Sequence, residues 1–470
     1  MYNNKQITLF TLLLSLLLVT VSVQLVSGQQ CESQLNSNSF FIQPNLCAWT
    51  VRTGLVEPRT IRVMSNGDIL VLEKPPASQI TVMFDSNKNG VIDGNEIAVL
   101  AKQANLNHGL TVQGAYLYAT TPTTVYRWKY TPGNRTNLGT PETVMTGVPA
   151  NSPNIMNGHS TRTIEFVNST SDGFYLSIGS AENLDATSIR SRVVKCSFDL
   201  SAIPQGGYTY SQCTVFADGC RNEVGLRVDS KGRLWGVENG MDNLNRADIG
   251  GDIHMDNPCE EVNIFTNEGG FYGYPYCFSE GKLAAPYGKG NRTQWAVSLT
   301  DTTHTDVWCD NSTNVGKPVF CMPAHAAPLD IMFNDLSTFP PPLNRGVLVS
   351  HHGSWNRKPT AGYQVVAIDT DPTSGLPIQG SLTKVIGVPT DGNEWNIRPV
   401  SLAILRPCGA YTECLLFSDD NTNSVYAVRS TLNDNTTTGS TTGSSSITTP
   451  SLSSSLFIIM IVLSCLIFIN

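Results

Sequence analysis

A hairpin pattern that recurs six times along the chain most constrains its fold. One copy, residues 221–242, reads as an apolar strand, a Gly-containing turn and a second strand that ends in polar residues (RNEVGLRVDSKGRLWGVENGMD). Alternating apolar residues on both sides of such a turn are typical of a β-hairpin. The other copies begin near residues 59, 108, 159, 325 and 398, and each of the six opens with Arg or His.

Six hairpins with no long helical pattern between them predict an all-β fold, a six-bladed β-propeller in which four-stranded sheets repeat around an axis. A β-sandwich or a β-helix could also carry six hairpins. The longest interval, between the fourth and fifth copies, contains a Cys-rich segment at residues 291–321 that looks inserted. A core of about 400 residues would normally divide into domains, but a propeller avoids this because each sheet packs on the next.

Both ends of the chain have the composition of processing signals. In residues 1–28, Lys5 comes before an apolar run, and small residues follow the run. This order predicts a secretory signal that is cleaved, and a membrane anchor that stays in place is the alternative. After the propeller at residues 29–430, residues 431–455 form a Ser/Thr-rich linker and residues 456–470 are apolar. This order predicts a GPI-attachment signal, with attachment at residues 443–446, and the alternative is a single membrane span. We therefore expect a secreted protein that a GPI anchor holds at the cell surface.

The cysteines and the glycosylation acceptors agree with an extracellular location. Twelve cysteines suit an oxidising compartment, and without Cys465 in the apolar tail the count is odd, so one thiol is left unpaired. Neighbours in sequence are predicted to form the disulfides Cys31–Cys47, Cys196–Cys213 and Cys408–Cys414. The Asn-x-Ser/Thr acceptors are Asn134, Asn168, Asn291, Asn311 and Asn435.

One segment has the spacing of a calcium-binding loop. Residues 85–96 (DSNKNGVIDGNE) match the twelve-residue pattern, with Gly90 at the sharp bend. The predicted ligands are Asp85, Asn87, Asn89, Val91, Asp93 and Glu96. No amphipathic helix flanks the segment, so we expect a structural loop between blades, and an ordinary Asn/Gly turn is the alternative. A weaker candidate is formed by the backbone carbonyls of Gly240 and Met241.

The residues that open the six copies are predicted to converge at one mouth of the central channel. They are Arg59, His108, His159 with Arg162, Arg221, His325 and Arg398, and the ends of the second strands add Glu73, Glu238, His351, His352, Asp419 and Asp420. Clustered guanidinium groups in a chain of net charge −8 indicate an anionic ligand and argue against nucleic acid. For each residue the alternative is a structural ion pair.

A histidine beside an anionic ligand can act as a general base near neutral pH. We predict that His159 has this role and that Arg162, three residues on, belongs to the same catalytic pair. The chain has neither a Gly-x-Ser-x-Gly elbow nor a dinucleotide glycine fingerprint that opens a helix. A serine-hydrolase triad and a nicotinamide cofactor therefore have no support.

At this point the motifs resemble those of a known family. The sequence is similar to the fungal pyrroloquinoline quinone (PQQ)-dependent pyranose dehydrogenases, and more distantly to sorbosone dehydrogenases and soluble quinoprotein glucose dehydrogenases. The likeness covers about residues 31–430 in unchanged order, and it rests on LNHGL (106–110), GHSTRT (158–163), CRNEVGLRV (220–228), GGDIHMDNP (250–258), GGFYGYPYC (269–277), AHAAPLDIMFN (324–334), HGSWNRKPTAGYQVV (352–366) and RPVSLA (398–403).

The resemblance implies a propeller that carries PQQ over the channel mouth, with Ca²⁺ between the cofactor and the backbone. It makes His159 the base for a sugar hydroxyl, and it places the carbonyls of Gly240 and Met241 at the calcium ion. The residues that it assigns to the cofactor are Arg221, Asn222, Arg357 and Arg398, followed by Arg59, His352 and Trp355 at the motif edges. Cys220 and Cys259 stand where the family usually has Leu and Gly, which suggests a Cys220–Cys259 disulfide.

The function expected from these features is PQQ-dependent oxidation of a sugar, with the electron acceptor left open. One alternative is a propeller that binds an extracellular ligand without chemistry. Another is a calcium-dependent lactonase, which would need carboxylate and Asn ligands on the channel axis. Fold does not decide among these three functions.

Overall fold

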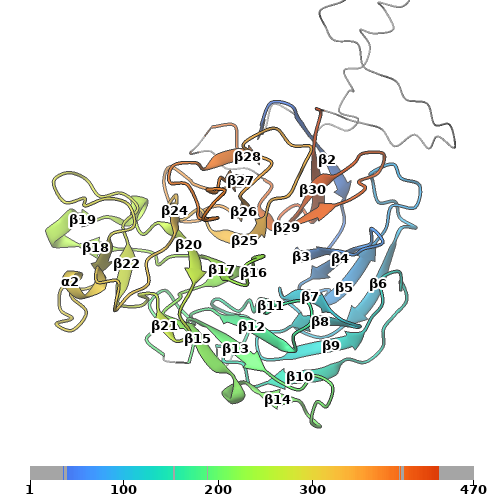
Figure 1. Cartoon of the computed structure of the whole chain (residues 1–470), viewed down its shortest axis with the longest axis horizontal. Helices are drawn as coiled ribbons and strands as arrows, with labels where there is room; N and C mark the ends of the chain where they lie inside the picture. Colours follow the sequence, from blue (N-terminus) through green and yellow to red (C-terminus); the bar gives the residue numbers. More distant parts are fainter. Residues whose placement is uncertain are drawn as a thin grey trace, which may run out of the picture. The chain divides into compact units, whose positions relative to one another are not determined.

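The computed structural model describes residues 35, 40–151, 154–187, 189–390, 392 and 396–432. Six sheets are arranged around a common centre (Figure 1), and each contains the four antiparallel strands of one blade. The predicted six-bladed propeller is confirmed, and the sandwich and β-helix alternatives are excluded.

The first three blades follow the chain from the centre of the ring outwards. Their strands are β3 (Pro58–Val63), β4 (Ile69–Glu73), β5 (Gln79–Met83) and β6 (Ile97–Lys102); β7 (Leu110–Gln113), β8 (Tyr116–Thr120), β9 (Val125–Lys129) and β10 (Glu142–Thr146); and β11 (Ile164–Phe166), β12 (Gly173–Ile178), β13 (Arg192–Ser197) and β15 (Thr214–Asp218). The second and third sheets gain a short parallel edge strand each, β14 (Tyr208–Thr209) and β21 (Gly270–Phe271).

The last three blades differ in how they are completed. Their strands are β16 (Glu223–Val228), β17 (Leu234–Glu238), β20 (Glu260–Phe265) and β24 (Phe320–Met322); β25 (Pro328–Phe333), β26 (Val347–His351), β27 (Gln364–Ile368) and β28 (Thr383–Gly387), with β1 (Phe41–Ile42) at the edge; and β29 (Pro399–Leu405), β30 (Cys414–Asp419), β31 (Ser424–Ser430) and β2 (Leu46–Arg52). The six predicted hairpins are the two innermost strands of each blade.

The ring is closed by the pairing of its two ends. Strand β2, near the start of the described chain, lies antiparallel to β31, near its end, and Ala48 pairs with Val428. The sixth blade therefore contains three strands from the end of the sequence and one from the beginning. Closure of this kind completes the sixth blade, which then packs on the first through buried side chains.

Apolar side chains fill the space between neighbouring sheets. Each adjacent pair of blades shares its own cluster of buried residues, six in all among the described residues. Between the fourth and fifth blades, for example, Trp235, Ile331 and Val349 are at most 1% exposed. Because the core is divided in this way, a chain of this length forms one ring.

The centre of the ring is charged. Arg227 on β16 lies 3.6 Å from Glu165 on β11 and 3.3 Å from Asp330 on β25, and Arg62 on β3 is close to both carboxylates. The innermost strands approach closely here, because a Cβ at Gly225 would lie 2.8 Å from the Cα of Asp330. Paired charges therefore occupy the middle of the channel.

The long interval after the fourth hairpin does contain inserted elements, but most of them lie outside the predicted segment at residues 291–321, whose last residues belong to β24 of the fourth blade. The interval forms two small hairpins, β18 (Asn245–Arg246) with β19 (Gly251–Asp252) and β22 (Cys277–Ser279) with β23 (Gln294–Ala296), and a short helix, α2 (Asp306–Cys309). The disulfide Cys277–Cys309 joins its parts.

The disulfides partly match the predictions. Cys196–Cys213 and Cys408–Cys414 are confirmed, and Cys31 lies outside the described residues. The suggested Cys220–Cys259 disulfide is wrong. Pairing of β20 with β24 brings the Cα of Cys259 to 5.4 Å from that of Cys321, with which it forms a disulfide, and Cys220 is a buried free thiol.

The predicted signal peptide, linker and GPI signal fall almost entirely outside the described residues and remain predictions. Among the residues that are described, no helix has the length and apolar character needed to cross a membrane.

Candidate active site

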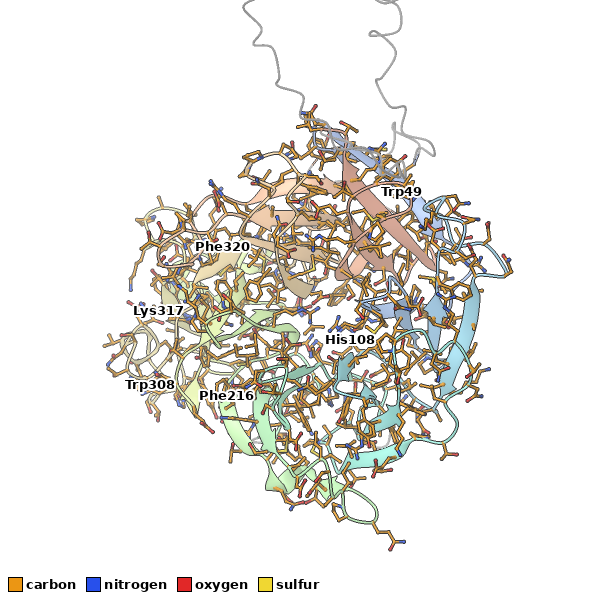
Figure 2. The ribbon with its side chains drawn as sticks, turned by 45° about the vertical axis from the view of Figure 1, so that its right-hand side comes forward. Trp49, His108, Phe216, Trp308, Lys317 and Phe320 are labelled. Carbon is orange, nitrogen blue, oxygen red and sulfur yellow. A yellow bond between two sulfur atoms is a disulfide. The ribbon has the colours of Figure 1, made fainter. Side chains whose placement is uncertain are left out.

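The starts of the six innermost strands meet at one end of the channel, as the repeat pattern predicted. Each blade contacts the next through a residue at this end, and His108 lies near the middle of the sheets in Figure 2. The contacts in order around the ring are Arg59 with His108 (3.3 Å), Asn107 with Ser160 (2.8 Å), Ser180 with Arg221 (2.8 Å), Asp242 with His325 (3.5 Å), Arg398 with the His352 carbonyl (3.0 Å) and Asp420 with Arg59 (2.6 Å).

His159 has one ring nitrogen available at this mouth. Its Nδ1 lies 3.1 Å from the carbonyl oxygen of Ser180 and 2.7 Å from the Ser180 hydroxyl, which itself donates to the Glu182 carbonyl. A carbonyl can only accept, so Nδ1 carries the proton and Nε2 is the acceptor in the neutral ring. Burial, followed by the charge of Arg221, lowers the pKa of His159 to about 3. The imidazole is therefore neutral near pH 7 and can accept a proton.

Arg162 supports the backbone around His159. Its guanidinium donates to the carbonyl oxygens of His159 (2.8 Å), Thr161 (2.6 Å) and Pro149 (2.6 Å), and the residue is 1% exposed. These contacts fix the position of His159, which makes Arg162 a positioning residue. The prediction that Arg162 also takes part directly in catalysis, as a pair with His159, remains a prediction.

Arg221 and Asn222 lie between the third and fifth blades. The Arg221 side chain donates to the carbonyl of Gly240 (2.6 Å) and to Asn183, and it lies 3.4 Å from Asp242. Asn222 is 6% exposed and its side chain is near Gly179, beside His159. Both residues thus lie next to His159, and the cofactor role that the resemblance implied for them remains a prediction.

Three further cofactor candidates surround Asp420. Arg59 lies 2.6 Å from one oxygen of Asp420 and His352 lies 2.8 Å from the other. Arg398 donates to the carbonyls of His352 and Gly353. Although burial opposes ionisation, the hydrogen bond from His352 and the charge of Arg59 hold the pKa of Asp420 below its ordinary value. This part of the mouth therefore contains two cationic side chains and one carboxylate that is already paired.

The HGSWNR motif contains two more cofactor candidates, Trp355 and Arg357. Arg357 contacts Asp256 (2.9 Å) and the carbonyl of Met255, and it lines two adjoining cavities of about 450 and 370 Å³. Trp355 is 79% exposed. Neither residue makes a described contact with the ring around His159, so their cofactor roles remain predictions.

The repeat pattern missed a cluster formed by Asp242, His254 and His325. Their ligating atoms lie within 4.8 Å of one another, and Asn356 donates to Asp242 (3.0 Å). His325 was predicted at the mouth because it opens the fifth hairpin. Asp242 is the last residue of the fourth hairpin copy, but His254 lies in the long interval after it, so only the fold reveals that the three residues are neighbours. Asp242 adds a carboxylate close to the Gly240 carbonyl.

The loop at residues 85–96 joins β5 to β6 inside the first blade, so the prediction that it lies between blades is wrong. It packs on the sixth blade through the Trp49 side chain, which donates to the Gly90 carbonyl (2.8 Å). Within the loop, Asp85 accepts from the backbone of Gly90 and Glu96 accepts from the backbone of Asp93. The carboxylates at both ends of the loop thus turn inward, but the loop itself satisfies them, so the calcium site and the alternative of an ordinary Asn/Gly turn both remain predictions.

Glu96→Gln is expected to remove most of the Ca²⁺-dependent stabilisation of the protein, because the last position of such a loop supplies a bidentate carboxylate. Thermal unfolding with Ca²⁺ or with a chelator, in the absence of cofactor, measures this. Lys88→Ala in the same loop is the control and should keep the full calcium effect. An unchanged calcium effect in Glu96→Gln would contradict the site.

Comparisons with known proteins decide the family. A model described as TrAA12-like matches residues 41–431. The chain belongs to this family. The resemblance to the PQQ-dependent sugar dehydrogenases is thereby confirmed. One similar protein is the PQQ-dependent pyranose dehydrogenase of Coprinopsis cinerea, 28% identical over 84% of this chain and 54% of that protein. This chain therefore spans about half the length of that relative.

Other family members match over most of their length. The PQQ-dependent sugar dehydrogenase of Hypocrea jecorina is 29% identical, over 82% of this chain and 88% of that protein. Among solved structures, the holo form of the Coprinopsis cinerea pyranose dehydrogenase PQQ domain superposes with a TM-score of 0.71 at 25% identity, over 83% of this chain and 97% of that one. A calcium structure of the Trichoderma reesei family AA12 enzyme gives the same TM-score at 26% identity, over 84% and 98%.

Proposed function

We propose that this TrAA12-like protein is a PQQ-dependent dehydrogenase that oxidises a sugar at its hemiacetal carbon or at a neighbouring hydroxyl. The observation that carries the proposal is the position of the His159 ring: its Nδ1 contacts Ser180, which leaves Nε2 as the acceptor, and it lies near Arg221 at the mouth where all six blades meet. Four disulfides among the described residues suit an extracellular enzyme.

The residues at the mouth fit an anionic cofactor with a calcium ion. Arg221, Arg398 and Arg59 offer guanidinium groups to carboxylates. The Gly240 carbonyl, the adjacent Met241 carbonyl and the Asp242 carboxylate are oxygen donors of the kind that Ca²⁺ prefers. In this structure Gly240 accepts from Arg221, so an ion there would replace that contact. When bound, PQQ supplies the quinone that accepts the electrons, and Ca²⁺ supplies Lewis-acid polarisation.

The protein's own contribution is proton transfer and positioning. Nε2 of His159 takes the proton of the sugar hydroxyl, while the Nδ1 contact with Ser180 fixes the orientation of the ring. Arg162 holds the His159 backbone through three carbonyls. Burial, followed by the positive charge of Arg221, lowers the pKa of His159 and keeps the ring neutral before the reaction, and Arg221 also favours an anionic group beside it.

The kcat/KM for sugar oxidation should not change through ionisation of His159 between about pH 5 and 8. The base is active when neutral, and its lowered pKa of about 3 means that the active form is lost only as the pH falls towards that value. The measurement is kcat/KM of the cofactor-loaded enzyme against pH. An acid limb near pH 6.5 that disappears in a His159 variant would contradict the lowered pKa.

The test of the proposal is a titration of the purified, calcium-loaded protein with PQQ, followed by dye reduction with a panel of sugars. A ligand held only by the folded state stabilises it by about 2.7 kcal/mol at a concentration 100 times its Kd. Binding with sugar-dependent dye reduction is the expected result. If PQQ neither binds nor supports dye reduction, the enzyme proposal fails.

A non-catalytic binding module is the second candidate, and one observation favours it. Arg59 and His352 are already paired with Asp420, so part of the mouth is satisfied without a ligand. Absence of PQQ binding would support this candidate. A lactonase has less support, because the channel-axis carboxylates Glu165 and Asp330 are paired with Arg227.

A further inference from the structure

Three glutamates form a row across the fourth blade. Glu223 on β16 pairs in register with Glu238 on β17, and Glu238 pairs with Glu261 on β20. Directly opposed residues point to the same face of a sheet, so the three carboxyl groups share one face. Their exposed fractions are 2%, 6% and 7%. Like charges opposite one another destabilise a sheet, so this row needs a compensating group.

The described contacts provide little compensation. Both carboxyl oxygens of Glu223 and Oε2 of Glu238 lack a donor in good hydrogen-bond geometry, and the polar neighbours of Glu223 are Glu238 and Asn263, which belong to the same cluster. None of the ion pairs found within the described ranges includes Glu223, Glu238 or Glu261. One oxygen of Glu238 accepts from the backbone N–H of Arg221 at 2.7 Å. Buried, unpaired polar atoms are rare, and buried carboxylates are paired, protonated or bound to a cation.

Two other side chains near the glutamates offer further atoms that could bind a metal ion. Asn263, on the same face of β20, donates to Glu261 at 3.2 Å, while its Oδ1 is fully buried and has no partner. The free thiol of Cys220 lies at the start of β16. Its sulfur and the carboxylates of Glu223 and Glu238 supply ligand atoms that all lie within 4.8 Å of one another. An unpartnered amide oxygen and a thiol thus point to a ligand independently of the three acids.

The local backbone leaves room for this arrangement. Gly236 pairs with Asn263 and precedes Glu238 by two residues, so it lies on the same face, where any Cβ would collide with the carboxylate of Glu223. A cavity of about 20 Å³ borders Glu238 and Glu261, but Cys220, Glu223 and Asn263 do not line it.

We propose that Glu223, Glu238 and Cys220 bind a divalent transition-metal ion of the zinc class, with Glu261 and Asn263 completing or orienting its ligands. Thiolate with carboxylate is a ligand set that Zn²⁺ accepts, whereas Ca²⁺ takes oxygen ligands only. The ion neutralises the glutamate row and joins β16, β17 and β20. Because Glu238 also binds the backbone of Arg221, the metal fixes the strand end that carries Arg221 and Asn222.

The experiment uses the full secreted protein without PQQ. It is stripped with a chelator and loaded with Zn²⁺ or Co²⁺ alone, and bound metal is measured by mass spectrometry. We expect one tightly held equivalent, and in the cobalt protein a thiolate-to-metal charge-transfer absorption. Cys220→Ser should abolish this absorption, and Glu223→Gln should abolish the equivalent of bound metal. Asp93→Asn, in the loop at residues 85–96, is the matched control and should retain both.

The wild-type cobalt spectrum tests the site even if a variant fails to fold. Three results would overturn the proposal. One is a bound metal ion that gives no thiolate absorption. Another is metal binding that persists in both Cys220→Ser and Glu223→Gln. The third is the absence of any zinc or cobalt binding, because the glutamates would then be neutralised by protons. Since no cofactor is present, the result is independent of whether the protein oxidises sugars.

Discussion

Replacing His159 by alanine is expected to lower kcat for sugar oxidation by about 10²–10⁴-fold, the usual contribution of general-base catalysis. The substitution removes Nε2, the ring nitrogen that is left as the proton acceptor when Nδ1 contacts Ser180. The contacts of Arg221, Arg398 and Arg59 do not involve the His159 ring, so PQQ should still bind with nearly unchanged affinity. The two measurements are dye reduction under saturating sugar and a PQQ titration of the same sample.

Two further variants test whether the loss of activity comes from the loss of the base at position 159. His159→Gln keeps a hydrogen-bonding side chain but supplies no base, so it should lose as much activity as alanine. His304→Ala is the control, because His304 lies in the insertion, paired with Asp301 at 2.6 Å, and should leave kcat unchanged. If His159→Ala retained kcat within about two-fold, a difference of less than 0.5 kcal/mol in the barrier, the base would have to be another residue of the mouth.

Replacing Asp330 by alanine is expected to destabilise the folded protein by about 3–5 kcal/mol, the cost of breaking a buried ion pair on one side only. Asp330 lies 3.3 Å from Arg227, accepts from the Ser401 hydroxyl (2.8 Å) and accepts from the backbone of Leu402 (3.0 Å). One carboxylate therefore connects the fourth, fifth and sixth blades. Its loss leaves Arg227 with only the more distant Glu165.

The environment of Asp330 explains why the effect should be large. Burial, followed by the charge of Arg227, lowers the pKa of the neighbouring Arg62 to about 10, whereas the charge of Asp330 favours the charged forms of both Arg62 and Arg227. The measurement is denaturant unfolding of the variant and the wild type. Asp335→Ala is the control, because the Asp335 side chain is 72% exposed in its ion pair with Arg406 and should contribute less than about 1 kcal/mol. Equal effects of both substitutions would contradict a role for the channel network.

Asp330→Asn separates charge from shape. The amide keeps an acceptor for Ser401 or Leu402 but removes the negative charge beside Arg227. We expect a loss of stability close to that of Asp330→Ala, because the uncompensated arginine is the larger cost. A nearly wild-type Asp330→Asn would show that hydrogen bonding, and not charge, connects the three blades.

The sequence by itself determined the blades and the end of the ring at which they meet. Alternation of apolar residues around a turn is a local property, since residues two apart share a face whatever the rest of the chain does. Each hairpin could therefore be located from its own residues, and the shared Arg or His at each opening marked equivalent positions. The same reasoning identified His159 and Arg221, because both lie at such openings.

Tertiary structure alone decided which residues are partners across the ring. The pairing of β2 with β31, the ion pair of Arg59 with Asp420 and the disulfide of Cys259 with Cys321 join segments far apart in sequence. No local pattern encodes such choices, because strand register and blade order fix them only when the ring closes. The glutamate row shows this most clearly. Glu223, Glu238 and Glu261 are unremarkable in three separate stretches of sequence, and strand pairing places their carboxyl groups side by side away from water.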